Sequence, residues 1–180
     1  MKLTRRNLIA GGVAGALAVP TVAALARWRW QHGSHTGLVH DTGLAAGNRF
    51  AAAGAAAGRP SMAVEGDVIR FARALVDTRP ALIAGITRHA DALLIGEVAA
   101  EAGYMLAAEL TGDAQGCAGN SCDAGFIALT RMAVGAGPLW AEAFGAWAAN
   151  PAGDIVPQEQ DSGWFADTHM ALGWLLVPRG

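Results

Sequence analysis

Residues 80–87 read Pro-Ala-Leu-Ile-Ala-Gly-Ile-Thr, and this stretch decides the fold. It is a continuous apolar run of strand length, which is typical of a parallel strand buried on both faces. Helix-forming sequence follows over 91–102, where Leu94 and Val98 share one face. A second apolar run at 104–110 predicts another strand. Strand, helix and strand at this spacing indicate a right-handed βαβ crossover.

The same alternation extends to both sides of this unit. We predict further strands at 37–41, 61–65 and 170–177, and further helices at 44–57, 66–76 and 138–149. These elements predict one three-layer α/β domain over residues 37–180, built on a mainly parallel sheet of four or five strands. By analogy with flavodoxin-like and Rossmann-like folds, we expect the strand order 2-1-3-4.

Residues 1–26 have a charged start, a weakly apolar middle and a small-residue end, which together predict a signal peptide. The sequence Thr4-Arg5-Arg6-Asn7-Leu8-Ile9 resembles the twin-arginine (Tat) family of bacterial export signals, and the resemblance covers the signal only. It implies recognition by the twin-arginine export machinery, export in the folded state, and a periplasmic or otherwise exported location. We expect cleavage after Ala26 and a linker over 27–36.

Two other interpretations of this segment stay open. It could be an ordinary secretory signal that carries two arginines. It could also stay uncleaved as an anchor, because residues 8–26 are about long enough to cross a bilayer. The glycines and Pro20 within it argue against a stable span. An uncleaved signal would be the protein's only membrane contact.

Charge and size limit the classes of partner. The chain has 180 residues and a formal charge of −2. The predicted signal holds three of the cations and no acid, so the remaining 154 residues have a formal charge of −5. This part forms one domain of ordinary size. A negative balance without a basic run argues against nucleic acid as a partner.

Polar residues follow the predicted strands, at the edge where open parallel sheets bind ligands. Asp41 and Thr42 end the first strand, and Thr87, Arg88 and His89 end the third. Arg88 could bind a carboxylate or phosphate beside a helix N-terminus. His89 and Asp41 are candidate acid–base groups. We therefore name all five as candidate ligand-binding residues, with His89 and Asp41 as candidate catalytic residues.

The competing interpretation is structural, because Asp and Thr are common helix N-caps. Asp41, Asp67 and Thr87 could each cap a helix and do nothing else. The first strand–helix turn lacks GxGxxG and the chain has no Walker motif, so no nucleotide cofactor is supported. We predict no cofactor of any kind and no metal site.

Four residues separate Cys117 from Cys122, in a Gly-rich segment. For an exported protein we expect them to form a disulfide. A redox-active pair and a metal-binding pair are the alternatives.

Three functions follow from these observations. We expect an exported accessory or binding protein, such as a small subunit of a periplasmic redox complex that travels with a co-exported enzyme. The first alternative is a periplasmic enzyme that acts on a small anionic substrate at the strand ends. The second alternative is a thiol or metal redox protein that uses Cys117 and Cys122.

Overall fold

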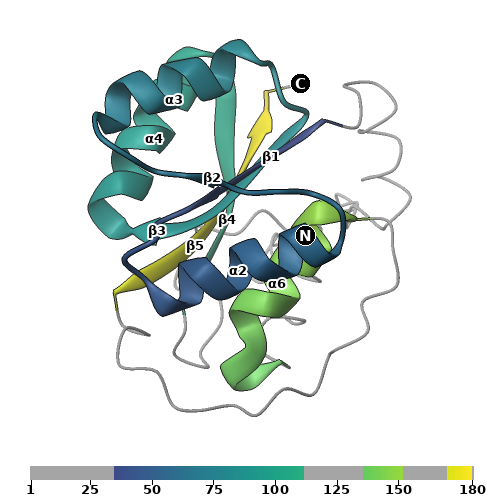
Figure 1. Cartoon of the computed structure of the whole chain (residues 1–180). Helices are drawn as coiled ribbons and strands as arrows, with labels where there is room; N and C mark the ends of the chain where they lie inside the picture. The colour runs from purple at the N-terminus through teal and green to yellow at the C-terminus, as the bar shows by residue number, and fades with distance from the viewer. Residues whose placement is uncertain (1–34, 112–135, 152–169, 180) are drawn as a thin grey trace, which may run out of the picture.

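The computed structural model describes residues 35–111, 136–151 and 170–179. In this part of the chain, a five-stranded sheet lies between two pairs of helices (Figure 1). Helices α2 and α6 contact each other on one face, and α3 and α4 contact each other on the other face. The predicted α/β class and three-layer arrangement are confirmed for the described residues.

The elements follow one another in the predicted alternation. They are β1 (Thr36–His40), α2 (Ala45–Ala56), β2 (Met62–Ala63), α3 (Val68–Asp77), β3 (Leu82–Arg88), α4 (His89–Glu101), β4 (Tyr104–Thr111), the 3₁₀-helix η4 (Gly137–Leu139), α6 (Trp140–Ala149) and β5 (Ala171–Pro178). None of these helices is long and apolar enough to cross a lipid bilayer.

The strand order is β2-β1-β3-β5-β4, which corrects the predicted order 2-1-3-4. β1 pairs in parallel with β2 and β3, as predicted. However, β5 enters between β3 and β4 and runs antiparallel to both. The sheet is therefore mixed rather than mainly parallel. β5 is buried over Ala171–Val177. Its nearly continuous apolar sequence therefore suits a central position in the sheet.

The second strand is much shorter than predicted. Only Met62 and Ala63 pair, opposite Val39 and His40, and the two residues form one edge of the sheet. Val64 still donates its amide to the His40 carbonyl, after which the chain turns towards α3.

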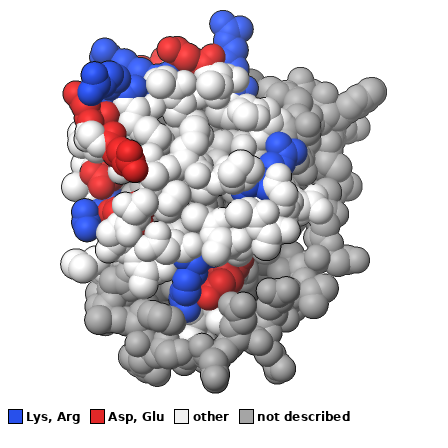
Figure 2. Space-filling model, in the orientation of Figure 1, with Lys and Arg blue, Asp and Glu red and all other residues white. Residues whose placement is uncertain are grey.

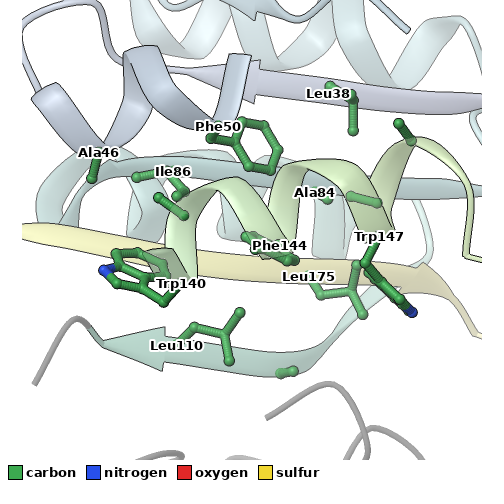
Figure 3. Packing of buried hydrophobic residues seen from close by; sticks show 14 of the residues in the cluster. Leu38, Ala46, Phe50, Ala84, Ile86, Leu110, Trp140, Phe144, Trp147 and Leu175 are labelled. Carbon is green, nitrogen blue, oxygen red and sulfur yellow. The ribbon is translucent and has the colours of Figure 1, made fainter. Parts of the chain in front are cut away.

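The core between the sheet and the α2–α6 pair is aromatic (Figure 3). Phe50 from α2 and Phe144 from α6 lie with ring centroids 5.2 Å apart. Trp140, Phe144 and Trp147 of α6 are all buried. At Gly145 a Cβ atom would collide with the backbone of Phe50, so this glycine allows the two helices to approach closely.

On the opposite face, one of the six cross-strand pairs between β3 and β5 places a glycine beside a tryptophan. Gly85 lies opposite Trp174, and the indole ring covers the glycine. A Cβ atom on Gly85 would lie 2.5–2.9 Å from three carbons of that ring. The missing side chain therefore makes the space that the buried indole fills.

We predict that Gly85→Ala destabilises the protein by about 1–3 kcal/mol, because the added methyl group must displace a buried indole. Gly96→Ala is the matched control, since no atom lies within 4 Å of its added Cβ on α4. Alanine there should stabilise the helix by about 0.5–1 kcal/mol. Urea unfolding of both variants measures the difference, and equal stability of the two would contradict the assigned packing of Trp174.

Candidate functional site

Asp41 and Arg88 meet at the carboxyl ends of the neighbouring strands β1 and β3. Asp41 is buried, and its Oδ1 accepts a hydrogen bond of 2.7 Å from the Gly43 amide. Its Oδ2 lies 3.3 Å from Nη1 of Arg88 as an ion pair without hydrogen-bond geometry. A Cβ atom on Gly43 would lie 2.8 Å from Nη2 of Arg88. Glycine therefore lets the guanidinium lie over the turn.

This ion pair is only partly shielded from water. The Arg88 side chain is 53% exposed, while that of Asp41 is 10% exposed. Solvent screens such a pair, so its contribution to stability is small. The exposed part of the guanidinium remains accessible to an anion in solution, at the residue that precedes α4.

Thr87 does not face this pair. Its side chain is fully buried, and its Oγ1 accepts a 3.0 Å hydrogen bond from Nε1 of Trp174. The same hydroxyl lies 3.1 Å from the Arg88 carbonyl, to which it donates. Helix α4 has no side-chain N-cap, so the capping interpretation of Thr87 is wrong. The Thr87 hydroxyl instead accepts the hydrogen bond of the buried Trp174 indole.

His89 and Thr42 are both exposed, and they do not lie together at one site. His89 is the first residue of α4 and lines a groove between α4 and β4. Thr42 lies in the turn after β1, where its carbonyl accepts a hydrogen bond from Asn48. Among the five predicted site residues, the side chains of Asp41 and Arg88 pair with each other, whereas the Thr87 hydroxyl bonds to the Arg88 backbone and to Trp174.

Asp67 behaves as the predicted helix cap. Its carboxylate accepts a 3.0 Å hydrogen bond from the Arg70 amide at the start of α3. This backbone hydrogen bond lowers the pKa of Asp67 below its usual value of 3.8. Asp41, in contrast, bonds within the turn before α2 rather than to the helix cap position.

The groove between α4 and β4 has a volume of about 260 Å³. Apolar side chains line much of it, and Leu93 on α4 is 62% exposed, while Met105 and Leu106 on β4 are each 41% exposed. Its charged lining residues are Glu97, Glu109 and Arg179. Figure 2 shows that charged side chains also gather over α3 and α4, at the upper left of that view.

The sequence predicted a strand over 104–110 but not this groove, because the apolar run alone did not show which of its residues would be exposed. β4 is an outer strand of the described sheet, with residues of partial exposure. A signal was present in α4: adjacent Leu93 and Leu94 cannot both point into one core, and both are exposed.

The described residues contain no cluster of three or more His, Cys, Asp or Glu side chains placed to hold a metal ion. Cys117 and Cys122 lie outside the described residues, so the expected disulfide and its redox and metal alternatives remain predictions. The same is true of the export residues Arg5 and Arg6 and of the predicted linker.

We predict that Thr87→Val lowers stability by about 1–3 kcal/mol, because valine has a similar shape but leaves the buried Trp174 N–H without an acceptor. Thr87→Ser keeps the hydroxyl and should cost less. Urea unfolding followed by tryptophan fluorescence compares the two variants. If valine is tolerated as well as serine, the hydrogen bond does not stabilise the fold.

Tyr104 provides a pH-dependent test at the end of the groove. Burial raises its pKa above the usual value of 10.0, and its hydroxyl donates a 2.7 Å hydrogen bond to the Pro80 carbonyl. The contribution of Tyr104 to the free energy of unfolding is therefore fully present below pH 10, and it is lost as the pH rises through the folded-state pKa. Tyr104 is the only tyrosine. Tyrosinate absorbance should titrate at higher pH in the native protein than in urea. Identical midpoints would show that the Tyr104 hydroxyl is exposed to water.

Comparison with known proteins identifies no relative: no family model, no curated protein and no solved structure matches this chain.

Proposed function

We propose that this protein is an exported accessory or binding protein, acting as a small subunit of a periplasmic redox complex. The observation that carries this proposal is that polar groups at the strand ends already bond to other groups of the same fold. Asp41 is held by Gly43 and Arg88, and the Thr87 hydroxyl is bonded to Trp174. These contacts engage the polar groups within the domain, and they leave His89 apart from Asp41, the other candidate catalytic residue.

An acid–base pair must converge on one reacting atom within hydrogen-bond distance. His89 lines the α4–β4 groove, whereas Asp41 belongs to the turn after β1 and contacts Arg88. The arrangement supports a binding role better than a catalytic one. The exposed apolar side chains of the groove add to this support, because contiguous apolar surface is typical of protein contacts.

The export proposal rests on the sequence of residues 4–9. The twin-arginine route carries folded proteins, and a small protein with such a signal can carry a bound partner with it. A cofactor-bearing enzyme subunit fits this role, because its cofactor would be inserted before export. This partner would supply the redox chemistry.

One observation favours the enzyme alternative as a second candidate. Arg88 is half-exposed immediately before α4, where a guanidinium and a helix N-terminus both attract anions. In this version Arg88 would hold a small anionic substrate, and Asp41 would orient the guanidinium.

Affinity purification of the tagged full chain from the periplasm of its own bacterium tests the proposal. We expect a cofactor-bearing protein in fixed stoichiometry, whose export is lost when this chain carries Arg5→Lys and Arg6→Lys together. The lysines keep the charge but remove the arginine pair. Fractionation followed by immunoblotting of both proteins measures export.

The matched control is Arg27→Lys with Arg29→Lys, which alters two arginines outside the export motif. It should leave export of both proteins unchanged. Arg88→Ala should leave the complex intact, since the accessory role does not use an anion site there. Recovery of the chain alone, with partner export independent of Arg5 and Arg6, would refute the accessory role.

A further inference from the structure

Two hollows of the described surface meet at Tyr104. The first is the groove between α4 and β4, with a volume of about 260 Å³. The second has a volume of about 590 Å³, and Pro80, Ala81, Ala102 and Pro178 line it together with Tyr104. Because Tyr104 lines both, the second hollow opens towards one end of the groove.

The described part of the chain begins beside this second hollow. The His35 carbonyl accepts a 2.8 Å hydrogen bond from the Ala81 amide, and the Pro80 carbonyl accepts a 2.7 Å hydrogen bond from the Tyr104 hydroxyl. β1 and β4 start at the same end of the sheet, since β1 runs parallel to β3 and both β3 and β4 run antiparallel to β5. Whatever precedes His35 therefore starts close to the groove.

The residues just before His35 carry two tryptophans. Residues 27–34, here called the N-terminal arm, read Arg-Trp-Arg-Trp-Gln-His-Gly-Ser. In an extended chain, successive side chains point to opposite sides, so Trp28 and Trp30 share one side and Arg27 and Arg29 share the other. An indole ring has a large apolar surface that is stabilised by burial. The arm therefore has an apolar side that needs a partner surface.

The arm is long enough to reach the groove. β4 is three positions from β1 in the strand order, which is about 14 Å at the usual strand spacing. Trp30 lies five residues before His35, and five residues span about 17 Å when extended. Trp28 reaches about 7 Å further. Both indoles can therefore lie along the groove without any rearrangement of the described fold.

We propose that the N-terminal arm crosses the second hollow and places Trp28 and Trp30 in the α4–β4 groove of its own chain. Leu93 and Leu106 provide partly exposed apolar surface for the indole rings. The α4 wall is open at Gly96, where no atom lies within 4 Å of an added Cβ, and an indole can fill this space. The contact buries apolar surface of both the arm and the groove.

Charge and tethering both favour this occupant. Glu97 and Glu101 are exposed one turn apart on α4, next to the path of Arg27 and Arg29. Oppositely charged groups across a contact fix its register more than its affinity. A short tether gives the arm an effective concentration in the millimolar range, which favours it over the same segment of a second copy in dilute solution.

Photocrosslinking of the purified exported protein tests the proposal. Trp30 is replaced by p-benzoylphenylalanine, an aromatic photocrosslinker, and crosslinked peptides are mapped by mass spectrometry after irradiation. We expect crosslinks within one chain, to residues 92–100 of α4 or 104–106 of β4. Leu106→Glu should lower their yield on the order of tenfold, because the contact would bury a carboxylate against an indole. Gly96→Leu should also lower it, by filling the space that the ring occupies.

Met62→Glu is the matched control, since Met62 is 40% exposed and Leu106 is 41% exposed, but Met62 lies on the other edge of the sheet. It should leave the crosslinking yield unchanged. Circular dichroism checks that each variant is folded. Crosslinks mainly between two chains would assign the groove to a second copy and overturn the proposal. Crosslinks to other parts of the chain, or a yield that neither Leu106→Glu nor Gly96→Leu lowers, would overturn it as well.

The docked arm goes beyond the accessory role and does not depend on it. Crosslinking is measured on the isolated chain, whereas the accessory role is measured by recovery and export of a second protein. An arm that does not crosslink to the groove, in a chain that still carries a co-exported subunit, would overturn the arm contact alone. A crosslinked arm in a chain that carries no partner would support the contact and refute the accessory role.

Discussion

The contact between Trp174 and the pair Gly85–Thr87 holds the two halves of the sheet together. It lies where β5 runs antiparallel to β3, which is the one step at which the chain leaves the parallel pattern of β1, β2 and β3. Gly85 leaves space for the indole ring, and Thr87 supplies the acceptor for its N–H. A buried indole needs both a large apolar space and a partner for its polar atom.

The position of β5 also decides which surfaces are exposed. Because β5 takes the place beside β3, β4 moves outwards, to the end of the described strand order. Its apolar sequence would suit a strand covered on both faces, yet Met105 and Leu106 lie at a partly open groove. The position of this one antiparallel strand thus accounts both for the buried contact with β3 and for the partly open groove at β4.

The sequence predicted the local elements well and their lateral order less well. Continuous apolar runs and helical spacing located the strand at Leu82–Arg88 and the helix beginning at Trp140 within a few residues. The neighbours of β5 could not be predicted, because they depend on contacts between residues far apart, such as Gly85 and Trp174. A glycine in an apolar run is ambiguous until the side chain that fills its space is known.

The candidate site illustrates the same limit at shorter range. Thr87, Arg88 and His89 are consecutive, and the sequence suggested one cluster. Successive side chains on a strand point to opposite faces. Thr87 therefore contacts Trp174 on the α4 side, while Arg88 reaches Asp41 after β1. His89 begins a helix and lies at the groove. This alternation is a property of the strand backbone. A binding role that uses the two faces separately therefore requires less rearrangement of the three residues than catalysis at one centre.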